Sequence, residues 1–385
     1  MQIELKASAS MGASHEKSEA RKVRIPVELR EIYGLECGQH VTFRGANGDL
    51  VTLRVDFCFK EDLAADDTAA YVAPSAMKLL DPTFSTITVG EVEMVGGITL
   101  GCDPEFFVIH KAQNTIVKAG TFFNKWDDVG CDGLMAELRP LPSTDEHTVT
   151  RNIGKLFGKA SARLKANPIG NQVRMIAVSG FRGTMAGFHL HFGIPTALIG
   201  KTIEIHRATT QFIKALDYYV AIPAMLIEGE MDFSRRTGMH LDYGKPGNYR
   251  LDNNITLEYR VPGGALLKHP VLTNGLLGLG IAVIEDVVSR LKVCTDAFTN
   301  LSELVCEEDL KQLYPNVPPV TDLQRIIMSP STVEARTHIG QIMTDVRSMI
   351  SYNARKASIE PFFECITKNA AISVDIEQNW RHLYA

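Results

Sequence analysis

The stretch GFHLHFG, residues 187–193, places two histidines two positions apart in an apolar run that glycines bound. Phe188, Leu190 and Phe192 alternate with His189 and His191, and this period of two predicts a β-strand. Both imidazoles then lie on one face of the strand, and the large apolar side chains lie on the other. A polar face turned to water is the simplest explanation, so the rest of the chain must decide whether the histidines form a site.

The composition restricts the class of protein before any other motif is considered. The chain has 385 residues, of which 45% are hydrophobic and 22% charged, as in ordinary globular proteins. A net charge of −5 and an isoelectric point near 6.1 give no general attraction for nucleic acid or an anionic membrane. The longest apolar run, residues 275–284, is too short to span a bilayer, and the first residues lack the apolar core of a signal peptide.

The seven cysteines include no CxxC pair, which indicates reduced thiols rather than a disulfide framework or a zinc site. We therefore expect a soluble, cytoplasmic protein without nucleic-acid or membrane partners.

The first quarter of the chain predicts a small β-domain. KVRIPVELREIYGLECGQHVTF, residues 22–43, has the pattern of a strand, a proline-opened helical turn, a glycine-containing turn and a second strand. A weaker version of this pattern follows at residues 70–89. The two halves resemble the double-psi and swapped-hairpin β-barrels. We therefore expect residues 1–95 to form a small β-barrel domain of one of these types, and residues 96–385 to form a second domain.

From residue 96 onward the pattern is that of an α+β domain. Strand-like segments at 100–110, 133–139, 185–193 and 255–261 alternate with helical stretches near 199–220, 265–294 and 333–355. Ser143 and Glu146 have the spacing of a capping box for a helix that ends near Lys165. We expect an α+β fold, in which helices pack on a mostly antiparallel sheet and the C-terminal region is helical.

Three further strands repeat the pattern of the histidine strand. Each places two charged side chains two positions apart with apolar neighbours: Asp103 and Glu105 in GCDPEFF (101–107), Glu137 and Arg139 in DGLMAELRP (132–140), and Glu258 and Arg260 in LEYRVPGG (257–264). A solvated sheet face usually carries Lys, Thr, Ser and Gln instead. If the four strands share a sheet, their carboxylates raise one another's proton affinity, and a divalent cation would relieve that repulsion.

The residue types indicate which ions the site would bind. Oxygen ligands with one imidazole favour Mg²⁺ or Mn²⁺ over Zn²⁺. Two arginines beside the carboxylates indicate a ligand with phosphate or carboxylate oxygens. The loop YGKPGNYR, residues 243–250, holds Lys245 in a glycine- and proline-rich turn and ends at Arg250. It could reach over phosphates, but it has neither the Walker nor the GxGxxG spacing, and a solvated hairpin explains it equally well.

In their order along the chain, which is GCDPEFF, DGLMAELRP, GFHLHFG, YGKPGNYR and LEYRVPGG, the five motifs resemble those of carboxylate–amine ligases of the glutamine synthetase and glutamate–cysteine ligase superfamily. They are most similar to the amidoligase-like proteins that tailed bacteriophages encode. The resemblance covers residues 98–265. It implies a glutamine synthetase-like antiparallel sheet shaped as a funnel, two or more Mg²⁺ ions, ATP at one end, and amide or peptide-like bond formation through an acyl phosphate. For a phage-encoded protein, the expected location is the host cytoplasm.

The resemblance also implies a role for each motif residue. The metal ligands would be Asp103, Glu105, Glu137, His189 and Glu258. The nucleotide contacts would be His191, Lys245, Arg250 and Arg260. Arg260 would meet the transferred phosphoryl group and is, with Arg139, a catalytic candidate. The role of Asp132 stays open, because it lies only five residues before Glu137.

Such a ligase joins an acid and an amine, which would be small molecules or peptides. ATP activates the acid, and catalysis of phosphoryl transfer is mostly positioning and charge neutralisation by Mg²⁺, Arg and Lys. A protein partner for the barrel and self-association also stay open. Two other classes remain: a virion or assembly protein that keeps the ligase fold without turnover, and a DNA-binding regulator that acts through the barrel.

Overall fold

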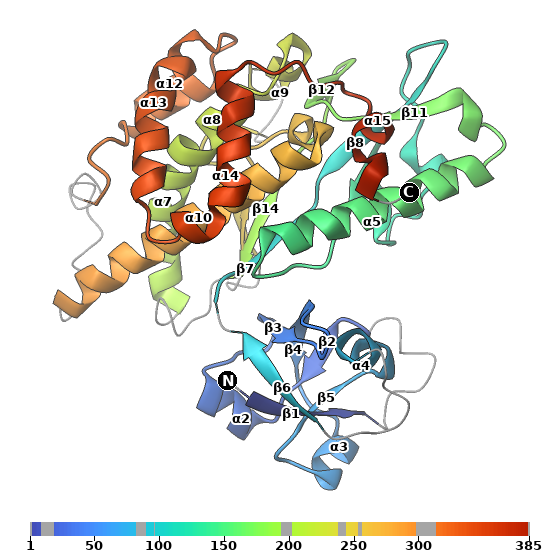
Figure 1. Ribbon diagram of the computed structural model, residues 1–385, viewed down its shortest axis with the longest axis vertical. Helices are drawn as coiled ribbons and strands as arrows, with labels where there is room; N and C mark the ends of the chain where they lie inside the picture. Colours follow the sequence, from blue (N-terminus) through green and yellow to red (C-terminus); the bar gives the residue numbers. More distant parts are fainter. Residues whose placement is uncertain are drawn as a thin grey trace.

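Six strands of the N-terminal part close into a β-barrel, which lies at the bottom of Figure 1. The computed structural model describes residues 2–8, 19–81, 90–95, 97–193, 202–237, 244–252, 256–297 and 313–383. The barrel strands, in the order in which they pair, are β1 (Gln2–Ala7), β5 (Ala70–Val72), β2 (Lys22–Arg24), β4 (Leu50–Asp56), β3 (His40–Arg44) and β6 (Gly90–Val95).

Two proline-led helices of the barrel begin where the sequence pattern places them. α2 (Val27–Tyr33) follows Pro26, and α4 (Pro74–Leu80) has Pro74 in its first turn, where a missing amide hydrogen costs little. A third short helix, α3 (Lys60–Ala65), lies between β4 and β5. The predicted N-terminal barrel is thus confirmed, whereas the division into two domains between residues 95 and 96 stays a prediction.

The rest of the chain builds two four-stranded sheets, and every pairing described within them is antiparallel. The first sheet has the order β11 (Val173–Ile176), β8 (Glu105–His110), β10 (Met135–Leu138) and β9 (Val129–Asp132). The second has the order β15 (Tyr249–Asp252), β16 (Thr256–Tyr259), β14 (Leu190–Gly193) and β7 (Thr99–Cys102). A two-stranded ribbon, β12 (Gly180–Phe181) and β13 (Thr184–Met185), completes the strands.

The expected strand 100–110 is two strands that belong to different sheets. β7 ends at Cys102 on the edge of one sheet, and β8 begins at Glu105 inside the other. Pro104 lies between them and has no amide hydrogen to continue a ladder. The junction is hydrogen-bonded to the segment that leads into β14 and to the end of β10. Glu105 N donates to Gly187 O at 2.9 Å, and Leu138 N donates to Pro104 O at 3.0 Å. The sequence analysis considered four charged strands in a single sheet. In the structure these strands belong to two sheets and meet at the seam between them.

Helices cover these sheets and fill the upper part of Figure 1. The longer ones are α5 (Glu146–Ala166), α7 (Thr202–Leu216), α10 (Pro270–Ala297), α12 (Val320–Ile327), α13 (Val333–Ser348) and α14 (Tyr352–Thr367). The short ones are η1 (Ala119–Thr121), η2 (Gly170–Gln172), η3 (Asp217–Ala221), α8 (Ile222–Met225), η4 (Glu230–Phe233), α9 (Ser234–Thr237), η5 (Gly264–Lys268), α15 (Ile376–Trp380) and η7 (Arg381–Leu383). The expected helix 333–355 is divided, since α13 ends before α14 begins. The predicted α+β class is confirmed.

Helix α5 corrects the predicted capping box. Its N-cap is Asp145, whose carboxylate accepts a hydrogen bond from the Thr148 amide at 2.7 Å. Ser143 cannot cap the helix because its backbone still pairs with Leu100 of β7, at 2.7 and 2.9 Å, in extended conformation. Helix formation therefore starts two residues later than the motif suggests.

Helix α10 is the central helix of the fold. Residues 270–291 are long and apolar enough to cross a membrane by length and composition, but 83% of that window is buried inside the protein. α14, α5 and α7 pack around it. α14 approaches closely because Gly275 faces Phe362, where a Cβ would lie 2.2 Å from the Phe362 Cβ. The burial explains why this segment is apolar on all sides.

Candidate functional site

Cross-strand pairing places the charged residues of the second sheet in rows on one face. His191 of β14 lies opposite Gly101 on one side and Glu258 on the other, and Arg250 of β15 lies opposite Glu258. Their apolar neighbours Leu190, Phe192 and Tyr259 are fully buried on the other face. The alternation read from the sequence is therefore correct, and the histidine strand does not turn its polar face to bulk water.

Four side chains converge at the seam, and we name them the acid–imidazole cluster: Asp103, His189, His191 and Glu258. The Asp103 Oδ1 atom lies 3.1 Å from His189 Nδ1 and 3.3 Å from His191 Nε2. His189 Nδ1 is also 3.5 Å from Glu258 Oε1. Side chains that are 69 to 88 positions apart along the chain thus meet within ion-pair distance.

The cluster fits a divalent cation. One ligand atom each from Asp103, His191 and Glu258 lies within 4.8 Å of the others. Asp103 Oδ1, His191 Nε2 and Glu258 Oε1 are buried, and their contacts within the described part of the chain are ion-pair distances without the alignment of a regular hydrogen bond. Buried polar atoms are normally hydrogen-bonded, so three such atoms aimed at one point are typical of a cation site. Two carboxylates and one imidazole suit Mg²⁺ or Mn²⁺.

Burial and charge set the proton affinities in the cluster. Burial works against ionisation of Asp103, but the adjacent His191 and His189 rings hold its pKa below the ordinary value. Burial also opposes a charge on His191, yet the carboxylate of Asp103 raises the pKa of that ring. His189 is more affected by burial, which lowers its pKa although Asp103 acts in the opposite sense. Asp103 is therefore the ionised centre of the cluster.

Two arginines surround the Glu258 carboxylate. Arg250 Nε donates to Glu258 Oε2 at 2.6 Å, and Arg260 Nε lies 3.2 Å from Oε1. The Arg250 side chain is 64% exposed, whereas that of Glu258 is 2% exposed. Positive charge therefore extends from the buried carboxylate toward solvent, where it can bind an anion such as a phosphate.

The first sheet contributes a second acidic pair, Glu105 and Glu137, which lie directly opposite each other on β8 and β10. Glu105 accepts a hydrogen bond from the Gly187 amide at 2.6 Å, and Glu137 pairs with Arg139. Burial, together with the charge of Asp103, raises the pKa of Glu105 to about 8 and that of Glu137 to about 7. The pair is thus close enough to Asp103 to feel its charge.

Three further predicted residues, Lys245, Asp132 and Arg139, lie outside the acid–imidazole cluster as defined above. Lys245 is half-buried in its turn, and no ion pair joins it to a residue in the described ranges. Asp132 is exposed at the end of β9, where its charge raises the pKa of Glu137. Arg139 also donates to the carbonyl oxygens of Lys125 and Asp127, at 2.9 and 2.7 Å, so the adjoining loop fixes its guanidinium.

The sequence analysis missed two residues that support the site. Arg235 of α9 is 2% exposed and donates to the carbonyl oxygen of Arg260 at 2.9 Å. Asp217 begins the π-helical turn η3 and accepts a hydrogen bond from the Tyr259 hydroxyl at 2.6 Å. A second hydrogen bond, from the Gly247 amide, joins Asp217 to the loop that carries Lys245. Neither residue belongs to a motif, and a π-helical turn leaves no pattern in a sequence.

Comparison with known proteins finds one family. A sequence profile described as "Phage phiEco32-like COOH.NH2 ligase-type 2" matches residues 100–382. No curated protein sequence matches significantly. Among solved structures, a bifunctional glutathione synthetase from Pasteurella multocida is 13% identical, with a TM-score of 0.36 over 72% of this chain and 53% of that one. The present chain thus spans about half the length of that protein.

Two further structures are similar to a comparable degree. GmaS without ligand is 12% identical, with a TM-score of 0.35 over 77% of this chain and 82% of that one. A structure described as a novel glutamine synthase homolog is 9% identical, with a TM-score of 0.28 over 89% of this chain and 98% of that one.

Proposed function

Because the chain belongs to the family of phage phiEco32-like COOH.NH2 ligases of type 2, we propose that it is an ATP- and Mg²⁺-dependent carboxylate–amine ligase. The observation that carries this proposal is the convergence of Asp103, His191 and Glu258 beside two arginines. A site that combines cation ligands with guanidinium groups suits a polyphosphate, since both neutralise its oxygens. The substrates would be a small-molecule or peptide acid and an amine.

The acid–imidazole cluster would hold the cation. In the sequence-based assignment His189 was the ligand and His191 the nucleotide contact, whereas the proposal now includes His191 among the ligands. His189 would orient the Asp103 and Glu258 carboxylates from behind, at 3.1 and 3.5 Å. Glu105 and Glu137 would hold a second cation on the neighbouring sheet. When bound, Mg²⁺ supplies charge neutralisation for the phosphates and orients them.

The reaction then needs two displacements. A carboxylate oxygen of the acid attacks the terminal phosphorus of ATP, the bond to ADP breaks, and an acyl phosphate forms. The amine nitrogen attacks the acyl carbon, inorganic phosphate leaves, and the nitrogen loses a proton. Arg260, 19% exposed, would meet the transferred phosphoryl group, and the more exposed Arg250 would bind the phosphates that remain on ADP. Arg139 beside Glu137 would face the acid substrate.

The proposal is tested by adding the protein and ATP to a lysate of host cells and searching by mass spectrometry for a new product. The expected product has the mass of an acid plus an amine minus water, and it forms only with Mg²⁺. The variants Glu258→Gln and His191→Asn should abolish it, whereas His382→Ala, at an exposed position on η7, should not. If wild-type protein neither binds MgATP nor consumes it in any mixture, the ligase proposal is wrong, and a non-catalytic assembly role replaces it.

A further inference from the structure

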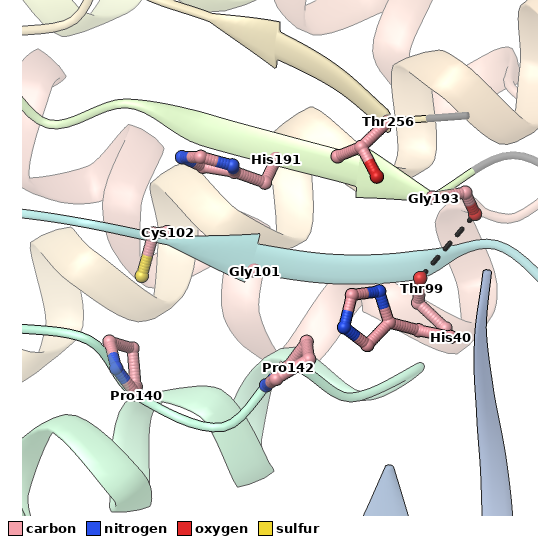
Figure 2. A pocket seen from close by; sticks show the side chains of 9 residues that line it. All are labelled: His40, Thr99, Gly101, Cys102, Pro140, Pro142, His191, Gly193 and Thr256. Carbon is pink, nitrogen blue, oxygen red and sulfur yellow. Dashed lines mark hydrogen bonds between the residues drawn. The ribbon is translucent and has the colours of Figure 1, made fainter. Parts of the chain in front are cut away.

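A pocket lies where the barrel meets the second sheet, and residues from both line it (Figure 2). His40, the first residue of β3, forms one wall. Thr99, His191 and Thr256 come from three strands of the sheet, and Pro140 and Pro142 come from the segment that follows β10. The cavity has a volume of about 190 Å³. This is smaller than the roughly 300–1,000 Å³ of clefts that enclose whole drug-sized ligands, so it fits one part of a larger ligand.

The pocket exists because two strands carry glycine where a side chain would fill it. Gly101 lies opposite His191, and Gly193 lies opposite Thr99 and Thr256. A Cβ on Gly193 would come within 2.3 Å of the Thr99 hydroxyl oxygen. A Cβ on Gly101 would lie in ordinary contact, 3.4 Å from Pro142 and 3.6 Å from His191, inside the pocket. The two glycines therefore leave a flat floor on the sheet face that bears His191 and Glu258.

The chemistry of the lining changes along this face. Among the residues that the structure describes, no carboxylate, ammonium or guanidinium group lines the pocket, and prolines, threonines, imidazoles and a buried thiol make up its walls. Burial, together with the charges of Arg54 and His191, lowers the pKa of His40 to about 4, so its ring is neutral at physiological pH. His191 also belongs to the acid–imidazole cluster, and Glu258 and Arg250 continue its cross-strand row beyond the pocket. The face thus passes from a pocket walled by prolines, threonines and imidazoles to a site that combines carboxylates with guanidinium groups.

We propose that this pocket binds the base of the nucleotide, whose phosphates lie at the acid–imidazole cluster, and that His40 of the barrel forms one wall of the base site. A nucleotide is the ligand that has an uncharged flat ring at one end and phosphates at the other. An imidazole ring offers a flat surface on which a base can stack, and proline rings offer an apolar surface against which it can pack. The inference rests on the proposed function, since it takes ATP as the ligand, and it gives the barrel a part in the site that the ligase motifs alone do not supply.

Calorimetric titration of the full chain with MgADP and with magnesium pyrophosphate tests the proposal, because pyrophosphate has no base. The His40→Ala variant removes one ring from the wall, and Gly101→Ala adds one methyl group to the floor. Loss of a stacking contact should lower the affinity for MgADP about ten-fold. Neither variant should change the affinity for magnesium pyrophosphate by more than about two-fold, which also shows that the variant is folded. The exposed His382→Ala is the matched control.

A His40→Cys variant gives a direct measure of occupancy. MgADP should slow alkylation of Cys at this position by iodoacetamide, read by mass spectrometry, whereas magnesium pyrophosphate should not. The half-buried Cys365 lies on α14 and reports any general effect of nucleotide on thiol reactivity. If MgADP binds wild type and the pocket variants equally, or if pyrophosphate protects as well as MgADP, the pocket proposal is wrong and the ligase proposal stands. If wild type binds neither MgADP nor MgATP and consumes no ATP, both are wrong.

Discussion

Replacement of Asp217 by asparagine should remove a pH dependence from the stability of the sheet that carries the site. Asp217 is 5% exposed, and its carboxylate accepts hydrogen bonds from the Tyr259 hydroxyl and the Gly247 amide. Burial raises its pKa from 3.8 to about 7, although both hydrogen bonds oppose the shift. Between these two pH values the folded protein retains a proton that the unfolded chain has lost. Rising pH across this window therefore destabilises the folded protein.

The size of the effect follows from the shift. Each pKa unit corresponds to about 1.36 kcal/mol, so the carboxylate costs about 4 kcal/mol above pH 7 and almost nothing below pH 4. Asp217→Asn cannot ionise. The free energy of unfolding of wild type, minus that of Asp217→Asn, should therefore fall by about 4 kcal/mol between about pH 4 and about pH 8. Other titrating groups cancel in this difference, and a lost hydrogen bond adds a constant that does not depend on pH.

Urea unfolding followed by tryptophan fluorescence measures this difference. Trp380 is fully buried in the same hydrophobic core as Tyr259, whereas Trp126 is 85% exposed. A Trp126→Phe background leaves Trp380 as the reporter, and the barrel contributes no signal because the chain has two tryptophans. Tyr259→Phe, which removes one hydrogen bond from the ionised carboxylate, should raise the pKa further and move the window to higher pH. A stability difference that is equal at both ends of the range would show that Asp217 titrates like an exposed carboxyl, and the reasoning would be refuted.

Two further outcomes test the electrostatics of the site and of the core. In the metal-free protein, Asp103→Asn should lower the pKa of His191, because burial and the charge of Arg250 still oppose a charge on the ring and only Glu258 still favours it; NMR titration that finds the pKa unchanged would contradict this. Glu146→Gln breaks a buried pair with Arg355, at 2.6 Å, and should cost about 3–5 kcal/mol in urea unfolding. Its control, Glu364→Gln, breaks an exposed pair, which solvent screens, and should cost much less; equal losses would show that burial does not matter.

The local alternation of residues could be predicted because it depends only on neighbours in sequence. The alternation of apolar and polar side chains is visible in a stretch of a few residues. The segments around His189, Glu137 and Glu258 accordingly form strands. The proline-led helices of the barrel were predictable for the same reason, since a proline favours the first turn of a helix.

Features that depend on distant partners could not be predicted. The break between Asp103 and Glu105 joins two sheets only because different strands pair on its two sides. Asp145 replaces Ser143 as the helix cap because β7 holds Ser143 in extended conformation. His40 belongs to an unremarkable barrel strand until the barrel is placed beside the sheet. In each case the sequence contains the residue, but its role comes from long-range packing.

The crossing of the chain from one sheet to the other at Asp103 has a mechanical consequence. The joint is bridged by a few backbone hydrogen bonds, and acids from both sheets repel each other across it. A bound cation would act as a cross-link between the sheets, so filling the site and stiffening the joint would be one event. Amide exchange at Glu105 and Gly187 would then slow together when Mg²⁺ is added. The joint would therefore become rigid on cation binding alone, before any substrate binds.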